Sequence, residues 1–290
     1  MKFSGGRFSS KKKIALNRPG AIGDCLMILN LMPKLRKKYP DYTIDFYTKT
    51  TGIEQIMLLS GIDNILDSDL INVNSHEYER IFNLIGYPVL TENYPNNGPI
   101  DKHLLEYFAI ELGLEVDKHN LPRFRIVMKP IINTDYITIH PFTGWSIYKE
   151  WGIEKWEQVV KAFPDKQFIQ IGVSTDRKIA GCNHSFMNVS LMKSINLIAN
   201  AKLHLGGDSF SNHITHMANT PAIILWGSTQ VSASGYEKNT NINLDLSCQP
   251  CWKENEGIST MTRGKCEYNH ACMAGITVDM VVQKIKEAVS

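Results

Sequence analysis

Short runs of apolar residues alternate with amphipathic stretches along most of the chain. This alternation is typical of parallel strands that are connected by crossover helices. Apolar runs that predict strands include residues 13–17, 43–47, 136–140 and 222–226, and residues 278–289 have the period of a terminal helix. The pattern therefore predicts an α/β fold.

The pattern is interrupted between Val116 and Ile132, where two prolines occur and helical periodicity is weak. Such segments commonly join domains. We expect one domain in residues 1–128 and a second in residues 129–290, because 290 residues suffice for two domains with cores of their own. Open parallel sheets bind ligands beyond the carboxyl ends of their strands, so we expect a central cleft between two facing units.

The overall charge is nearly balanced, with 31 lysines and arginines against 29 acidic residues. This balance argues against a nucleic-acid partner. Two local basic clusters, residues 11–13 and 36–38, have the charge to attract an anionic membrane surface, but a solvated strand start and a solvated helix end are the favoured explanation. No apolar run approaches the roughly 18 residues that span a bilayer, and no signal-like region follows residues 1–10, so we expect a cytoplasmic protein.

The first candidate site is the junction between the strand at residues 13–17 and the helix that follows it. Gly20 and Gly23 permit a tight turn here, and Asp24 lies at the helix start. Asp24 is either a first-turn residue stabilised by the helix dipole or a catalytic base at the rim of the sheet. The dinucleotide-binding pattern G-x-G-x-x-G is absent, because Pro19 replaces one residue of the tight turn.

A second junction spans residues 205–213, which are rich in small and hydrogen-bonding side chains. A helix that begins here would direct free N–H groups at a diphosphate. A plain N-cap formed by Asp208 or Ser209 is the alternative. His213 and His216 are expected to be a structural pair, because the sequence offers no third metal ligand nearby.

A third candidate is the loop at residues 141–152, where Lys149 has the charge to neutralise a phosphate. A solvated surface lysine is the alternative interpretation. The turn that contains Ser228 and Thr229 follows another predicted strand and adds hydroxyl groups to the same edge.

These junctions, in this order, resemble glycosyltransferase family 9, the family of bacterial ADP-heptose transferases. Arg18 and Asp24 match its R-x-x-x-x-G-D motif, and Lys149 matches its lysine before a W-P or similar pair. Residues 208–213 and 226–229 are similar to its D-[ST]-G-x-x-H and F-G-x-T motifs. The resemblance covers nearly the whole chain and implies a GT-B fold, in which two Rossmann-like domains face a central cleft.

The resemblance also implies an inverting glycosyltransferase that needs no metal or other cofactor for catalysis. Heptose would pass from ADP-heptose to a lipopolysaccharide or to another surface-glycan or protein acceptor, at the cytoplasmic face of the inner membrane with peripheral membrane contact. Asp24 would be the general base. The implied donor-binding residues are Lys149, Asp208, Ser209, Phe210, Ser211, Asn212, His213, Ser228 and Thr229.

Phe210 departs from the family pattern, which has a glycine at this position. Close approach of the backbone to a phosphate is harder without glycine. Phe210 thus keeps open a degenerate nucleotide-binding protein without activity. A GT-B transferase that uses another nucleotide sugar also stays open, because nothing in the sequence excludes it. The chain is also short for the family, which suggests a trimmed acceptor domain.

Four of the six cysteines lie in a polar segment, residues 248–272, with the spacing C-x2-C-x14-C-x5-C. Such spacing predicts a structural metal site at Cys248, Cys251, Cys266 and Cys272. Free or oxidised thiols are the alternative. The resemblance gives iron equal weight with zinc, because some similar protein-modifying heptosyltransferases bind iron through four cysteines.

Overall fold

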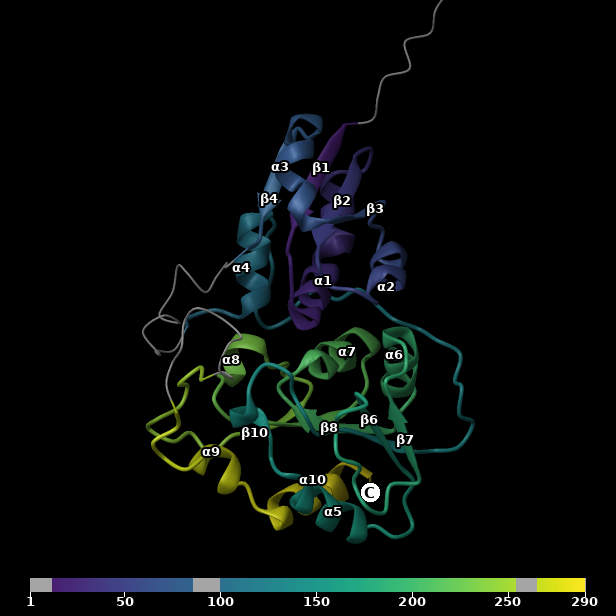
Figure 1. Cartoon of the computed structure of the whole chain (residues 1–290), viewed down its shortest axis with the longest axis vertical. Coiled ribbons are helices and arrows are strands. Elements are labelled where there is room, and N and C mark those ends of the chain that lie inside the picture. Colours follow the sequence, from purple (N-terminus) through teal and green to yellow (C-terminus); the bar gives the residue numbers. More distant parts are fainter. Residues whose placement is uncertain (1–11, 86–99, 254–264, 290) are drawn as a thin grey trace, which may run out of the picture.

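The computed structural model describes residues 12–85, 100–253 and 265–289. Their strands form two open parallel sheets, one in each half of the chain. Figure 1 shows the two units one above the other, with the helices α1, α7 and α6 between the sheets. The predicted α/β architecture with two parallel-sheet units is confirmed.

The first sheet has the strand order β3-β2-β1-β4. The strands are β1 (Lys13–Asn17), β2 (Thr43–Thr48), β3 (Asn64–Asp67) and β4 (Arg80–Asn83). Alternate residues of β2 face opposite sides, so Ile44 and Phe46 enter the core beneath the helices while Tyr47 packs on the other face. The elements around this sheet are α1 (Ile22–Lys38), α2 (Glu54–Leu59), η1 (Ser68–Leu70), α3 (Ile71–Asn74), η2 (Ser75–Glu77) and α4 (Leu104–Glu111).

The second sheet has the order β10-β9-β8-β5-β6-β7. The strands are β5 (Ile137–His140), β6 (Phe168–Gly172), β7 (His184–Met187), β8 (Leu203–Gly207), β9 (Ala222–Leu225) and β10 (Thr240–Ile242). Helices cover both faces, as parallel sheets require. They are η4 (Ile147–Lys149), α5 (Ile153–Lys161), α6 (Leu191–Ala199), α7 (Phe210–Ala218), α8 (Val231–Ser234), α9 (Ala271–Ala274) and α10 (Val278–Val289).

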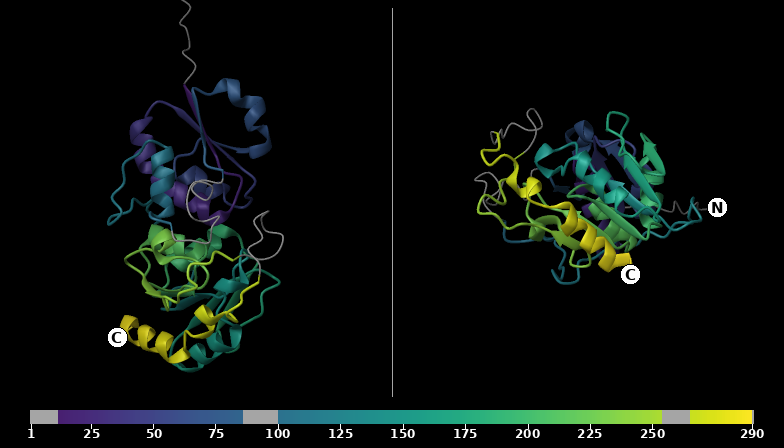
Figure 2. Two further views of the ribbon diagram at one scale, coloured as in Figure 1. Left: turned by 90° about the vertical axis from the view of Figure 1, so that its left-hand side faces the viewer. Right: turned by 90° about the horizontal axis from the view of Figure 1, so that it is seen from below.

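One apolar core joins the two units. Side chains of α1 and α7 belong to the same buried cluster, which includes Leu29 and Ile214. The side chain of Gln230 also pairs with the backbone of Ile100, accepting from its N–H at 3.0 Å and donating to its C=O at 2.9 Å. Figure 2 shows the units stacked end to end, with α10 on the side away from the first sheet. This packing places the first turn of α1 against the first turn of α7.

Most elements have nearly the predicted bounds. β1 and α10 have the predicted bounds. The sequence predicts helices from about Cys25 and from His213, whereas α1 begins at Ile22 and α7 at Phe210, each three residues earlier. The short strands β3, β7 and β10 were not predicted. The expected domain boundary at residues 128 and 129 falls between α4 and β5, and the division itself stays a prediction.

Candidate functional site

Asp24 lies in the first turn of α1, directly beyond the carboxyl end of β1. The Arg18 guanidinium donates to its carboxylate and, at 2.7 Å, to the carbonyl oxygen of Leu84. The backbone N–H of Ala21, at the start of the helix, lies 3.4 Å from the same carboxylate oxygen. Asp24 is thus both a first-turn acid and an anchored carboxylate at the rim of the sheet, and its side chain stays 23% exposed.

The first turn of α7 lies opposite. A Cβ placed on Gly23 would lie 3.2 Å from the Cδ2 and Nε2 atoms of His213, and 3.9 Å from the Cα of Phe210. The absence of a side chain at Gly23 therefore permits the two helices to meet closely. Asp24 is near enough to act electrostatically on His213. The structure brings together these two predicted site residues, which are far apart in the sequence.

Lys149 and Asp208 form a buried ion pair at the start of α7. The Lys149 Nζ lies 2.8 Å from the Asp208 carboxylate and 3.0 Å from its carbonyl oxygen. The hydroxyls of Thr229 and Ser234 donate to the same carboxylate at 2.8 and 3.1 Å. Burial alone would raise the pKa of Asp208, but the charge and hydrogen bond of Lys149 bring that pKa below its usual value. Lys149 also lies 4.6 Å from the ring centre of Trp145.

The turn after β9 connects this ion pair to the cysteine-rich segment. Thr229 contacts Asp208, whereas the buried Ser228 hydroxyl donates to the Lys253 carbonyl oxygen at 3.2 Å. A Cβ on Gly227 would collide with the Tyr148 carbonyl oxygen, so only glycine fits there. Ser228 therefore holds the main chain of the turn, and its predicted contact with the donor stays a prediction.

The remaining predicted residues of α7 face the interior to different degrees. The Asn212 amide donates to the Ser234 carbonyl oxygen at 2.8 Å and accepts from Asn239 at 2.9 Å, so its side chain is engaged inside the unit.

Ser211 is fully buried, and the Ser209 hydroxyl lies 2.9 Å from the Ser211 hydroxyl. The Phe210 ring packs edge-on against His140, with ring centres 4.8 Å apart. The sequence placed these side chains near the helix start but could not tell which way they point.

Two residues of this site, His140 and Tyr236, were not predicted from the sequence. His140 ends β5, and its Nδ1 lies 3.1 Å from the Ser209 hydroxyl. Tyr236 is buried, and its hydroxyl lies 2.8 Å from the Nδ1 of His213. Burial lowers the pKa of both histidines to about 4. A polar residue at the end of a predicted strand was a signal for His140, but Tyr236 lies in an irregular segment with no pattern to mark it.

The four cysteines of the predicted metal site line one cavity of about 420 Å³. Burial raises the pKa of Cys251, and raises that of Cys272 to about 11. Within residues 12–85, 100–253 and 265–289, no group of three or more His, Cys, Asp or Glu side chains is arranged to hold a metal ion. The thiols thus share a cavity, and metal binding stays a prediction.

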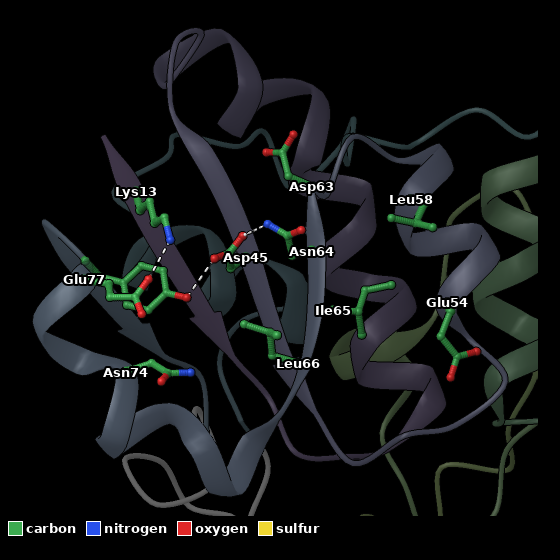
Figure 3. Close-up of a pocket in the computed structure, with 11 residues that line it drawn as sticks. Lys13, Asp45, Glu54, Leu58, Asp63, Asn64, Ile65, Leu66, Asn74 and Glu77 are labelled. Carbon is green, nitrogen blue, oxygen red and sulfur yellow. Dashed lines mark hydrogen bonds and ion pairs between the residues drawn. The ribbon is translucent and has the colours of Figure 1, made fainter. Parts of the chain in front are cut away.

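A larger pocket of about 570 Å³ lies in the first unit, where Lys13, Asp45 and Asn64 line it near the amino ends of β1, β2 and β3 (Figure 3). Its buried carboxylate, Asp45, accepts from Tyr78 and from Asn64, both at 2.7 Å. Lys13, at the edge of the pocket, pairs with Glu77. Because its buried acid is fully engaged and the pocket is remote from Asp24, we do not assign it to the candidate site.

Most side chains of the two basic clusters that the structure describes are paired with local groups. Lys12 and Lys13 form ion pairs with Glu79 and Glu77, at 2.9 and 2.6 Å, while Lys11 lies outside the described residues. Arg36 pairs with Asp63. None of the described helices is both long and apolar enough to cross a membrane.

Comparison with known proteins supports the predicted family. The family model of glycosyltransferase family 9 (heptosyltransferase) matches residues 103–261. The solved iron-containing dodecameric glycosyltransferase TibC from enterotoxigenic E. coli H10407 is similar with a TM-score of 0.75 and 14% identity, over 96% of this chain and 78% of that one. The E. coli ADP-heptose lipopolysaccharide heptosyltransferase II has a TM-score of 0.71 and 15% identity, over 95% and 98% of the two chains.

A family 9 glycosyltransferase from Veillonella parvula has a TM-score of 0.68 and 14% identity, over 96% of this chain and 97% of that one. No curated protein matches the chain. At these identities the likeness concerns the fold, and it confirms the predicted GT-B architecture.

Proposed function

Because this chain belongs to glycosyltransferase family 9 and is therefore a glycosyltransferase, we propose that it transfers heptose from ADP-heptose to a surface-glycan or protein acceptor. Lipopolysaccharide is the acceptor that we favour, since a similar solved structure carries that substrate in its name. The observation that carries the proposal is the junction of α1 and α7, where Asp24 lies close to the first turn of α7.

In this proposal Asp24 is the general base. Its carboxylate takes the proton of the acceptor hydroxyl, whose oxygen forms a bond to the anomeric carbon while the bond from that carbon to the diphosphate breaks. Attack opposite the leaving group inverts the anomeric configuration. Arg18 holds the Asp24 carboxylate in place by donating a hydrogen bond to it from one guanidinium nitrogen. A second guanidinium nitrogen of Arg18 donates to the Leu84 carbonyl oxygen, which fixes the orientation of the arginine.

The departing ADP requires positive charge and N–H donors. The start of α7 supplies the positive end of a helix dipole, and the Lys149 ammonium lies beside it. Phe210 replaces the glycine of the family motif, but its ring packs on His140 and on the shared apolar core. The partly buried Phe210 side chain is thus accommodated by the packing at the start of α7.

We also propose a structural zinc or iron ion at the four cysteines. Thiolates are the ligands that both metals accept in structural sites, and the four thiols line one cavity. The backbone N–H of Cys251 donates to the Ser228 carbonyl oxygen at 3.1 Å. This bond connects the cysteine cavity to the turn that is predicted to bind the nucleotide sugar. Elemental analysis of the purified protein tests this: about one metal ion per chain is expected, and a Cys251→Ser/Cys272→Ser variant should lose it. A metal-free wild-type protein would contradict the site.

A cytoplasmic location with peripheral contact to the inner membrane completes the proposal. Lys12 and Lys13 keep exposed ammonium groups although each has an acidic partner. Neutralising residues 11–13 should lower binding to vesicles rich in anionic lipid, measured by co-sedimentation. Unchanged binding would remove these lysines from the contact.

The transfer itself is tested by incubating the protein with ADP-heptose and a lipopolysaccharide core that lacks heptose. We expect release of ADP that depends on the acceptor, and a product whose anomeric configuration, read by NMR, is opposite to that of the donor. Retained configuration would contradict the mechanism. Turnover of a GDP- or UDP-linked sugar in place of ADP-heptose would favour the alternative donor.

A further inference from the structure

His213 has two ring edges in different surroundings. Its Nδ1 lies 2.8 Å from the Tyr236 hydroxyl, inside the second unit. Its Cδ2 and Nε2 atoms lie against Gly23, the residue before Asp24. Among the described residues the His213 Nε2 atom has no hydrogen-bond partner. This atom is not fully buried, so it reaches solvent at the junction of the units.

The direction of the hydrogen bond between the two side chains follows from the burial of Tyr236. This tyrosine is 2% exposed, and in the described part of the chain the His213 Nδ1 is the one hydrogen-bond partner of its hydroxyl. A buried O–H group is nearly always paired with an acceptor. If Nδ1 carried the proton, the phenolic proton would have no acceptor. The hydroxyl therefore donates to Nδ1, and a neutral imidazole then carries its own proton on Nε2.

Both groups are uncharged at neutral pH. Burial lowers the pKa of His213 to about 4, and the charges that face it are those of Asp208, Asp24 and Lys149. Burial also raises the pKa of Tyr236 well above its usual value. A neutral phenol beside a neutral imidazole is the pair that this hydrogen bond requires.

The position of Tyr236 is itself fixed. Its ring stacks on His216 with centres 4.0 Å apart and planes inclined by 5°. The His216 Nε2 lies 3.1 Å from the Pro122 carbonyl oxygen, which holds that ring in turn. The phenol is therefore held in place independently of its bond to His213.

We propose that Tyr236 is a positioning residue that holds His213 in the tautomer with its proton on Nε2, and that this N–H donates to a phosphate oxygen of the nucleotide-sugar donor. The second part rests on the proposed function. One consequence is that neutral His213 has no free lone pair on Nε2 with which to accept a proton. Of the two groups at this junction, Asp24 is then the one able to act as the base.

The tautomer is measurable in the free protein. A two-bond ¹⁵N–¹H correlation spectrum of histidine-labelled protein distinguishes protonated from unprotonated ring nitrogens. For His213 we expect Nε2 protonated and Nδ1 unprotonated, and a mixture of tautomers in Tyr236→Phe. The matched control is Tyr136→Phe, which removes another buried hydroxyl, one that donates to the Leu197 carbonyl oxygen at 2.9 Å. A protonated Nδ1 in the wild-type protein would overturn the proposal.

The consequence for the donor is tested by titrating ADP into the same variants. Tyr236→Phe should weaken ADP binding by the factor by which it depletes the tautomer with its proton on Nε2, about twofold for an even mixture of tautomers. Tyr136→Phe should leave ADP binding unchanged. Because Tyr236 acts through His213, the same substitution should have little further effect in a His213→Gln background, where an amide replaces the Nε2–H donor. An equal loss in both backgrounds would indicate a merely structural tyrosine and overturn the positioning role.

The phosphate contact of His213 and its tautomer are tested separately. If the wild-type protein binds no nucleotide, the proposed function and the phosphate contact of Nε2 are both wrong, while the spectrum still decides the tautomer. If ADP binds but the spectrum shows Nδ1 protonated, the proposed function stands and the role of Tyr236 falls.

Discussion

The Lys149 ammonium and the Asp208 carboxylate lie 2.8 Å apart, with side chains only 10% and 7% exposed. Each side chain compensates the charge of the other at a site that is nearly excluded from solvent. The pair also joins η4 to the start of α7, so the phosphate-binding lysine of the proposed mechanism is fixed before any ligand arrives.

Removal of either partner should leave a buried charge unpaired. We expect Lys149→Met to lower the free energy of unfolding by about 3–5 kcal/mol, measured by urea denaturation. Lys202→Met is the control, since it removes a surface pair whose partners are 63% and 81% exposed and should cost less than about 1 kcal/mol. Equal decreases in the free energy of unfolding of the two variants would show that the buried pair stabilises the protein no more than the surface pair does.

Gly227 should tolerate no side chain. A Cβ there would collide with the Tyr148 carbonyl oxygen, so Gly227→Ala must displace the turn that holds Ser228 and Thr229. We expect a loss of about 1–3 kcal/mol in the free energy of unfolding. At Gly144, in the loop before Lys149, nothing lies within 4 Å of an added Cβ, so Gly144→Ala serves as the control. A Gly227→Ala protein as stable as Gly144→Ala would contradict the packing of this turn.

His204 should make stability depend on pH. Burial, followed by the nearby His140, lowers its pKa to about 3 in the folded protein, whereas an unfolded histidine has a pKa of about 6.5. Between these values the unfolded chain binds a proton that the folded chain does not, so stability falls as the pH falls. Between pH 6 and pH 5, the free energy of unfolding of the wild-type protein should fall by about 1.2 kcal/mol relative to that of His204→Leu.

The same denaturation series contains its own control. Above pH 7.5 neither state protonates the imidazole, so the difference between the two proteins should stay constant there. A difference that is also constant between pH 6 and 5 would show that His204 is not held neutral by burial.

Asp24 should be required for transfer but not for folding. Asp24→Asn removes the base while leaving a hydrogen-bonding group of the same size, and turnover should fall by about 10²- to 10⁴-fold. The release of ADP from ADP-heptose measures this. Asp63→Asn changes the carboxylate of another Arg–Asp pair near the far end of α1 and should leave turnover unchanged. Full activity in Asp24→Asn would exclude its catalytic role.

Much of the fold follows from local pattern. Residues 13–17 are a short apolar run and residues 278–289 have a helical period, and their predicted bounds agree with β1 and α10. The start of α1 was placed too late because its first turn contains Gly23, a residue with low helix propensity. In the first turn of a helix tertiary contacts matter more than propensity, and here the glycine allows contact with His213.

The contacts inside the site could be predicted only in part. Lys149 and Asp208 were both singled out, but they are 59 residues apart and nothing in either segment shows that they pair. Asn212 lies at the predicted helix start, yet its amide points inward to Ser234 and Asn239. Tyr236 comes from an irregular segment, and its importance depends on a partner 23 residues away. Such pairings are decided by tertiary packing, which a single sequence does not specify.

The proposed function requires that the junction of α1 and α7 belongs to an enzyme that uses an ADP-linked sugar. Calorimetric titration of the purified wild-type protein with ADP, GDP and UDP measures this preference. We expect micromolar binding of ADP and much weaker binding of the other two nucleotides. Equal binding of all three would contradict the ADP-heptose assignment, and no binding of any nucleotide would contradict the proposed function.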